Sequence, residues 1–290
     1  MTGDKNGEPK IQAVGRARFY KSVTVVAADS PPPGGEGPGV GGTPTIDVLQ
    51  SPPPSPSPAS CRRHASGVMG EGRAQAFHIL LDGKPVRTPA KRGLVLPARA
   101  LADAVAAEWE SQKARIDPVT MPLTRLANSA IDGVTGRETE VRADIARYAA
   151  SDLVCYRAES PPELVRRQLQ AWDPVLAWAR DALGAHFLPA QGIMPVIQPA
   201  PAVASVARAA EVHEAFELAA LHVMTTLMGS ALLALAHARG HLTADDAWAA
   251  AHIDEDWQIS QWGEDAEAKA RREARWLEMQ AASRLIQLLD

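Results

Sequence analysis

Hydrophobic and polar residues alternate along two short stretches near the N-terminus, which is the period-2 pattern of half-buried β-strands. The first stretch covers residues 18–26 and the second covers residues 76–81. Asp82-Gly83 then predicts a tight turn into a return strand over 84–88, and residues 94–96 predict one further short strand. We therefore expect a small antiparallel sheet near the N-terminus.

The apolar spacing changes to three or four residues after Pro97, which predicts helices. Leu101, Val105 and Trp109 lie four apart on one face of the first predicted helix. Ser160 and Glu163 have capping-box spacing, and Thr243 with Asp246 resembles another capping box. Further helices are predicted over residues 122–131, 137–150, 163–183 and 254–288.

Residues 30–60 interrupt the predicted sheet with a different composition: 10 Pro, 6 Gly and 5 Ser in 31 positions. Such a segment cannot bury enough apolar surface to offset its ordering entropy, so we expect a disordered insertion over 29–73. Its PPPSPSP run is also compatible with an SH3-type ligand. Deletion of residues 30–73 should cost little stability.

These patterns together predict an α+β protein in which a small mixed α/β domain with antiparallel strands precedes an all-α domain. We expect a disordered tail over residues 1–15, the N-terminal domain over 16–133 and the helical domain over 134–290. Residues 218–236 form a run of 19 residues without a formal charge. We interpret this run as a buried helix, with a membrane span as the alternative.

Charge and cysteine content exclude several classes of protein. The 290 residues carry 30 Lys and Arg against 34 Asp and Glu, a net charge of −4, which argues against a nucleic-acid partner. The two cysteines, Cys61 and Cys155, exclude a disulfide scaffold. No signal-peptide pattern begins the sequence, so we expect a cytoplasmic bacterial protein, or a mitochondrial matrix protein if the source is eukaryotic.

The sequence contains no catalytic motif with the required spacing, so we expect no catalytic residue, cofactor or metal site. There is no phosphate-binding glycine loop between a strand and a helix. His213 and Glu214 begin like a zinc-protease helix, but Glu217 occupies the position of the second histidine. His213 and His222 could form only a weak metal site, and separate histidines are the preferred interpretation.

Residues 253–267 gather six carboxylates around two tryptophans. On one continuous helix, Asp254, Gln258, Gln261 and Asp265 would share a polar face. Glu255 would fall on the apolar side with Ile259 and Trp262, where it needs a cationic or hydrogen-bonding partner, and Trp257 would lie roughly opposite Trp262.

Three interpretations of this acidic segment remain open. It could bind the Arg or Lys side chains of another protein, with tryptophan anchors. It could instead carry the carboxylates of an enzyme that acts on a small polar substrate, or be a solvated face. The pattern favours binding over catalysis.

Six segments of the chain, in order, resemble the assembly-chaperone family for the alpha subunit of the ATP synthase catalytic head, a mitochondrial F1 assembly factor family with alphaproteobacterial members. They are RFYKSVTV from Arg18, LLDGKPVRTPA from Leu80, AAEWESQKARIDPVTMPLTRLANSAID from Ala106, SDLVCYRAESP from Ser151, RQLQAWDPVLAWA from Arg167 and DEDWQISQWGEDAEA from Asp254. The insertion departs from the family pattern.

The resemblance implies a non-enzymatic molecular chaperone that binds the free alpha subunit and shields its assembly interface until the catalytic head forms. It implies no cofactor and no stable membrane insertion, and we expect a monomer when the client is absent. It also implies a functional acidic position among Glu255, Glu264 and Glu267, and Trp109 is a further candidate anchor. The predicted partner-binding residues are Glu255, Trp257, Gln258, Trp262, Glu264, Asp265 and Glu267.

Overall fold

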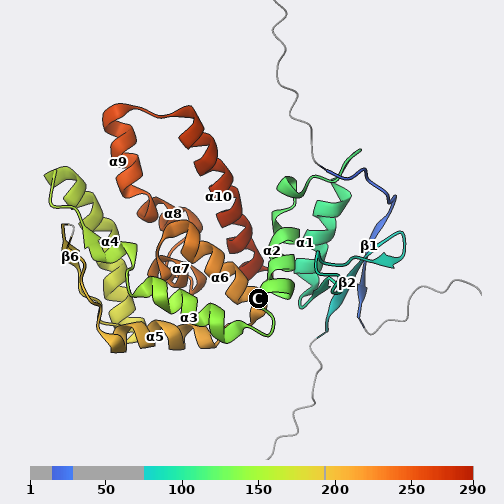
Figure 1. The fold of residues 1–290 in the computed structure, drawn as a ribbon, viewed down its shortest axis with the longest axis horizontal. Coiled ribbons are helices and arrows are strands. Elements are labelled where there is room, and N and C mark those ends of the chain that lie inside the picture. Colours follow the sequence, from blue (N-terminus) through green and yellow to red (C-terminus); the bar gives the residue numbers. More distant parts are fainter. Residues whose placement is uncertain (1–14, 29–74, 193, 290) are drawn as a thin grey trace, which may run out of the picture.

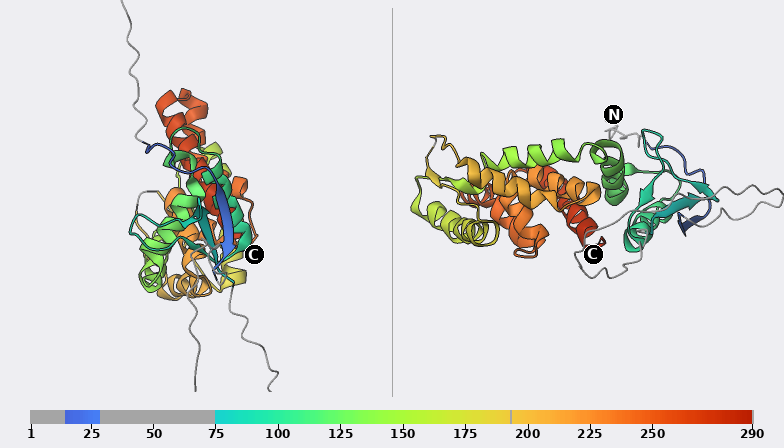
Figure 2. Two further views of the ribbon diagram at one scale, coloured as in Figure 1. Left: turned by 90° about the vertical axis from the view of Figure 1, so that its right-hand side faces the viewer. Right: turned by 90° about the horizontal axis from the view of Figure 1, so that it is seen from below.

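The computed structural model describes residues 15–28, 75–192 and 194–289. Residues 1–14 of the expected tail and the whole expected insertion over 29–73 lie outside this described part. Figure 1 shows a small sheet with α1 on one side of the molecule and a larger body of helices on the other, and Figure 2 shows the same elongated arrangement from two further directions. The α+β prediction is confirmed.

Four short strands form the described sheet: β1 (Val23–Ala27), β2 (Phe77–Leu81), β3 (Lys84–Pro85) and β4 (Val95–Leu96). Antiparallel β1 and β2 place Val23 opposite Leu81, and β2 also pairs with β3 and β4. The predicted turn is present, since Asp82 and Gly83 both have positive φ, 48° and 76°. This conformation matches the right-handed twist of the flanking strands.

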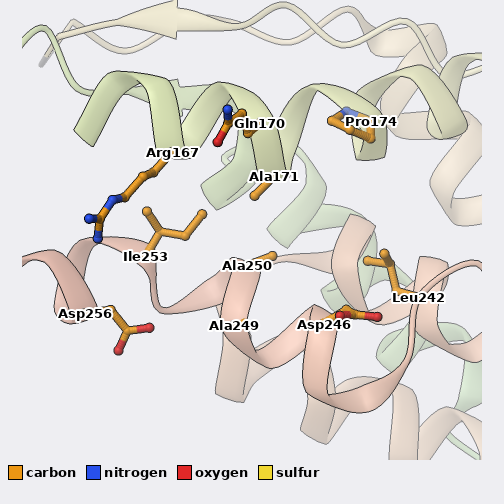
Figure 3. Close-up of a pocket in the computed structure, with 10 residues that line it drawn as sticks. All are labelled: Arg167, Gln170, Ala171, Pro174, Leu242, Asp246, Ala249, Ala250, Ile253 and Asp256. Carbon is orange, nitrogen blue, oxygen red and sulfur yellow. The ribbon is translucent and has the colours of Figure 1, made fainter. Parts of the chain in front are cut away.

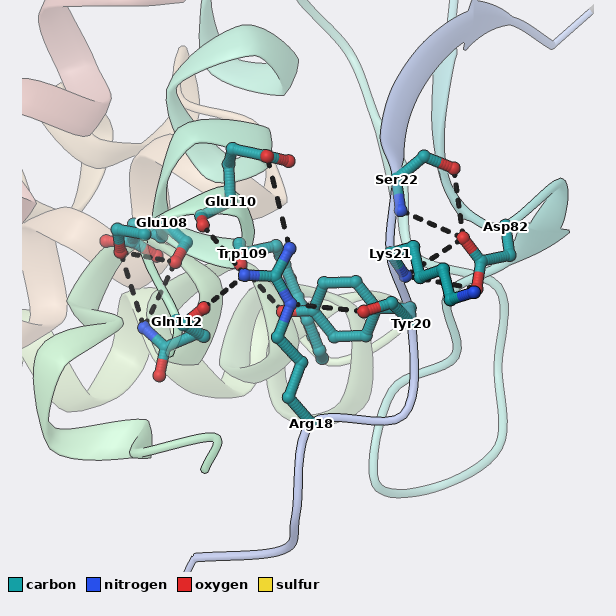
Figure 4. A network of polar contacts seen from close by, with 10 residues as sticks. Arg18, Tyr20, Lys21, Ser22, Asp82, Glu108, Trp109, Glu110 and Gln112 are labelled. Atoms are coloured by element: carbon teal, nitrogen blue, oxygen red, sulfur yellow. Dashed lines mark hydrogen bonds and ion pairs between the residues drawn. The ribbon is translucent and has the colours of Figure 1, made fainter. Parts of the chain in front are cut away.

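The prediction that β1 begins at residue 18 is wrong, because the residues before Val23 bond elsewhere. Arg18 donates its backbone N–H to Ala114 O at 3.0 Å, and the Tyr20 hydroxyl donates to Trp109 O at 2.6 Å. The segment therefore crosses the end of α1 (Arg99–Glu110) before it enters the sheet (Figure 4). The return strand is also shorter than predicted and ends at Pro85.

Helix α1 packs against the sheet, and α2 (Pro122–Ser129) continues into a π-helical segment, Ala130–Val134. These elements connect the sheet to the helical body, since α2 packs on both α1 and α10 (Ala266–Gln287). Arg125 of α2 forms an ion pair with Glu278 of α10 at 3.2 Å. The apolar core runs without interruption from the sheet through α2 into the helices.

The helical body is built around one short apolar helix, α7 (Ala231–Ala238). It comprises α3 (Glu138–Ala149), α4 (Pro162–Leu183), α5 (Ala200–Glu211), α6 (Ala215–Met228), α7 (Ala231–Ala238), α8 (Ala244–Ala251), α9 (Ile253–Trp262) and α10, with a short parallel pair of strands, β5 (Tyr156–Arg157) and β6 (Ala190–Gln191). Every residue of α7 from Ala231 to Ala236 is fully buried.

The uncharged run over 218–236 is not one helix. Gly229 ends α6 in the left-handed conformation at φ 65°, and the Ser230 hydroxyl accepts from Leu233 N to begin α7. The preferred interpretation of the run, burial in an all-α core, is confirmed by these two elements. In the described residues, no helix combines the length and the apolar character that crossing a bilayer requires.

Two predictions about helix ends are wrong and one is confirmed. The Ser160–Glu163 capping box is absent: Pro161 precedes α4 without a side-chain cap, and Glu163 pairs with Arg166 and Arg167 instead. The single helix over 254–288 is broken into α9 and α10. Thr243 does cap α8, accepting from Asp246 N at 3.1 Å.

Candidate functional site

The predicted acidic segment forms an exposed bend between two helices rather than one helix face. We define the α9–α10 arm as residues 253–272, which comprise α9, the connection at 263–265 and the first two turns of α10. Gly263 breaks the helix with φ 87° and ψ 173°, a conformation that is essentially restricted to glycine. Every residue from 260 to 271 is exposed, and Figure 1 shows this bend at one extremity of the molecule.

The new helix begins at Asp265, whose carboxylate accepts from Ala268 N at 2.8 Å. An aspartate in this position satisfies one of the free N–H groups at the helix start. The prediction that Asp265 shares one helical face with Asp254 and Gln258 is therefore wrong. Asp265 is the N-cap of α10, and it remains exposed to solvent.

The other acidic side chains of the arm differ in how they are compensated. Glu264 pairs with Lys269 at 2.9 Å, Glu267 pairs with Arg271 at 2.7 Å, and Asp256 pairs with Arg272 of α10. Glu255 differs from them: among the residues described, its only ionisable basic neighbour within 4.0 Å is the Nε2 of His252, at that limit. Asp254 and Asp265 also have no ion pair but each accepts a hydrogen bond, so within the described part of the chain Glu255 is the one carboxylate of the arm that accepts none.

Glu255 also lies in a different environment from the one predicted. Its side chain is 53% exposed, so it does not occupy the apolar position that would have required a close partner. The adjacent His252 is buried and packs against Trp248 in a tilted arrangement, with ring centroids 3.9 Å apart. Burial lowers the pKa of His252, which keeps the imidazole predominantly neutral at pH 7. The neutral imidazole of His252 therefore does not offset the charge of Glu255.

The two tryptophans of the arm face different surroundings. Trp257 is half-buried against α4, where the Arg167 guanidinium lies 5.1 Å from its ring centroid. Trp262 is 79% exposed, at the last residue of α9. The two rings thus lie in different environments, as their predicted places on roughly opposite sides of the helix would require. Trp262 exposes a large apolar side chain that the described fold does not use.

A groove lies beside the arm, between α4 and the α8–α9 segment (Figure 3). It has a volume of about 570 Å³. Its walls are largely apolar, with Ala171 and Pro174 from one side and Ile253 from the other; Arg167 and Asp256 lie at one end and Asp246 at the other. An apolar groove with charged residues at both ends suits an amphipathic protein segment better than a small polar substrate.

Polar contacts hold α9 against α4 and fix the position of the arm. Asp254 accepts from Gln168 Nε2 at 2.7 Å, and the buried Gln168 in turn accepts from Ala158 N at 2.8 Å. Arg157 donates to the Gln168 carbonyl at 3.0 Å and pairs with Asp173 at 2.8 Å. Because Gln168 and Arg157 are buried, these contacts give α9 a defined position against α4.

Other predicted features are placed away from the arm. Trp109 is half-buried and packs edge-on against Tyr20, with centroids 5.8 Å apart, so it belongs to the core beneath the sheet. His213 pairs with Glu217 and His222 with Asp144, and the residues described contain no cluster of His, Cys, Asp and Glu suited to a metal. Cys155 is buried, and burial raises the pKa of its thiol to about 12.

Sequence reasoning missed the residues that complete the surface. Arg167 on α4 and the groove floor are distant in sequence from the acidic segment, and no local pattern connects them. The pairing of Glu267 with Arg271 has the i, i+4 spacing of a helix pair and could have been predicted. Arg272 could not, because its contact with Asp256 exists only once Gly263 has turned the chain.

Comparison with known proteins places this chain in a family. The family model described as ATP12 chaperone protein matches residues 63–180. Among solved structures, Atu1473, a suggested chaperone from Agrobacterium tumefaciens, is 51% identical with a TM-score of 0.72, covering 74% of this chain and 81% of that one.

Two structures from Paracoccus denitrificans are similar as well. Atp12 is 41% identical with a TM-score of 0.70, covering 74% of this chain and 92% of its own. An aspartate-to-lysine mutant of Atp12p is 33% identical with a TM-score of 0.73, covering 94% of this chain and 98% of that chain.

Proposed function

Because this chain belongs to the ATP12 chaperone family, we propose that it is a chaperone of ATP synthase assembly and that it binds the free alpha subunit through the α9–α10 arm. ATP12 family members are assembly chaperones and not enzymes. The observation that carries the assignment of the surface is Trp262, which is 79% exposed in a continuous stretch of exposed, mostly polar residues.

The physical demands of the task agree with the surface. A subunit that awaits its partner exposes an apolar, partly charged interface, and such a surface aggregates when it is left uncovered. A chaperone needs an apolar side chain that covers this interface and polar residues around that side chain that permit release. Tryptophan is among the residues most enriched at the energetic centres of interfaces, and water-exposed charges around it favour fast, reversible association.

The roles within the proposed surface follow from the local contacts. Trp262 is the apolar anchor, and Glu255 is the carboxylate that receives an Arg or Lys of the client. Gln258 lies on the same exposed side of α9 and can supply hydrogen bonds. Glu264 and Glu267 are already paired with Lys269 and Arg271 of α10, so they contribute mainly to the negative field that guides a basic client surface. Trp257 lies on the side of α9 that packs against α4, and it stabilises the position of α9.

Direct binding tests this proposal. Purified alpha subunit is titrated with wild type, Glu255→Lys and Trp262→Ala, and the suppression of alpha-subunit aggregation is followed by light scattering. We expect both variants to bind at least about tenfold more weakly, the scale expected for an anchor or a buried charge at an interface. Their melting temperatures should match wild type, because both positions are exposed.

Glu211→Lys is the matched control. Glu211 is exposed at the end of α5, on a different side of the helical body from the arm, and the substitution changes the net charge by the same amount as Glu255→Lys. The proposal fails if the wild type does not bind alpha subunit, or if the arm variants bind it as tightly as Glu211→Lys does.

A further inference from the structure

A second groove lies at the far end of the molecule from the arm, beneath the edge of the sheet. It has a volume of about 510 Å³. Its apolar lining comes from Phe19, Leu81, Pro85, Val86, Trp109 and Ile116. These residues come from three of the family-like segments of the sequence, which begin at Arg18, Leu80 and Ala106. None of those three segments contributes to the α9–α10 arm. We call this feature the sheet groove.

Hydrogen bonds around the sheet groove hold its walls in place (Figure 4). Tyr20 connects the N-terminal segment to α1 through its 2.6 Å hydrogen bond to Trp109 O. Arg18 donates to the Tyr20 carbonyl at 3.2 Å and to the carbonyl of Gln112. A groove that is preformed in this way does not lose further backbone freedom when it binds a ligand.

Three cations line the sheet groove: Arg16, Lys84 and Arg87. All three are exposed, and within the described ranges none of them lies within 4.0 Å of a carboxylate. Asp82 is the one acidic residue of the lining, and its carboxylate already accepts from Lys21 N at 3.0 Å and Ser22 N at 2.9 Å. The groove therefore presents uncompensated positive charge around an apolar floor.

Phe19 gives this surface an exposed aromatic ring. It is 57% exposed, and the guanidinium of Arg16 lies 4.9 Å from its ring centroid. An aromatic side chain beside unpaired cations is suited to a ligand that carries an apolar side chain next to carboxylates. The charge of this surface is opposite to that of the α9–α10 arm.

We infer that the sheet groove is a second client-binding surface, which takes an extended segment of the alpha subunit with a bulky apolar side chain adjacent to acidic residues. This inference rests on the proposed function. The sheet lies on the opposite side of the molecule from the helical body that carries the arm (Figure 1), so one client bound at the arm and at the sheet groove would engage two surfaces of opposite charge. Two linked contacts of modest strength bind more tightly than either alone, and each can be released separately.

Charge reversal in the groove tests the inference. The double variant Lys84→Glu with Arg87→Glu is compared with a control double variant, Lys91→Glu with Lys113→Glu, which makes the same change in net charge at exposed positions outside the groove. Affinity for purified alpha subunit is measured by calorimetry at several salt concentrations. We expect the groove variant to bind about tenfold more weakly than the control, with a smaller dependence on salt.

The outcomes separate this inference from the function on which it rests. If the wild type binds alpha subunit and Glu255→Lys weakens it, while the groove variant equals its control, the sheet groove is not a client surface and the arm proposal stands. If the wild type does not bind alpha subunit, both proposals fail together. Circular dichroism of each variant establishes that a loss of affinity is not a loss of folding.

Crosslinking identifies the occupant. Phe19 is replaced by photoreactive benzoylphenylalanine, which its exposed position accommodates, and the complex with alpha subunit is irradiated and digested. We expect crosslinked alpha-subunit peptides rich in Asp and Glu. Crosslinks to basic alpha-subunit peptides, or only to residues 253–272 of a second copy of this chain, would overturn the inference, the latter by making the groove a self-association site.

Discussion

Replacement of Asp152 by Asn should change how the stability of this protein depends on pH. Asp152 is completely buried, and its carboxylate holds two elements together. It accepts from Val154 N at 3.2 Å, which begins the 3-10 turn Leu153–Cys155, and from Leu232 N at 3.0 Å, which lies in the first turn of α7. Burial raises the pKa of this carboxyl from 3.8 to about 6.

The magnitude follows from the two pKa values. The folded state binds the proton of Asp152 more tightly than the unfolded state, so this residue favours folding most strongly below pH 3.8, and the advantage is lost as pH rises through about 6. The full difference is about 3 kcal/mol, of which about 2 kcal/mol falls between pH 4.5 and pH 7. Asn carries no charge at any of these pH values and lacks the dependence.

The assay is urea unfolding of wild type and Asp152→Asn at pH 4.5, 5.5, 6.5 and 7.5, followed by circular dichroism. Asn places an amide NH₂ toward one of the two N–H donors, so the variant should be less stable throughout, by about 1–3 kcal/mol at neutral pH. The wild type's advantage should be about 2 kcal/mol larger at pH 4.5 than at pH 7. An advantage that is constant, or that grows as pH rises, would refute the reasoning.

Two further predictions compare matched substitutions by urea unfolding. Gly263→Ala should destabilise the protein by about 1–3 kcal/mol, because φ 87° with ψ 173° strains any residue that has a Cβ. Gly133→Ala should be neutral or slightly stabilising, because its new Cβ meets open space and its φ is not positive. Equal changes in stability for the two variants would contradict this prediction. Trp172→Phe should lower the free energy of unfolding by about 2 kcal/mol, since the buried indole donates to Ala250 O at 2.7 Å. Trp262→Phe should change it by less than about 0.5 kcal/mol, because Trp262 is exposed. A comparable loss of stability in both variants would contradict the exposure of Trp262.

The position of Gly263 explains why the acidic segment is available to a partner. Glu255 and Trp262 both lie in α9 and keep their helical relation, whereas a continuous helix would have carried residues 264–267 straight on beyond Trp262. The break instead turns α10 back beside α9, so that Arg272 pairs with Asp256 (Figure 1). The result is an extremity composed of exposed residues, fixed to the body by the Asp254–Gln168 contact. Its exposure is a consequence of one glycine conformation.

The sequence by itself determined the features that depend on local chemistry. Alternation of apolar residues located β2, Asp82-Gly83 located its turn, and four-residue spacing located α1. The α+β class and the family followed from the same residues. The segment proposed as the binding surface was also chosen from the sequence, because a concentration of carboxylates around tryptophans is visible in the chain itself.

Only the tertiary structure decided which side chains of that segment remain available. Glycine at 263 permits the break but does not require it, so packing of α10 on α6 and of α9 on α4 determines the outcome. The compensation of Asp256 by Arg272, the support of Trp257 by Arg167, and the cations of the sheet groove all join residues distant in sequence. Such pairs depend on distances that exist only in the folded chain, and local periodicity carries no information about them.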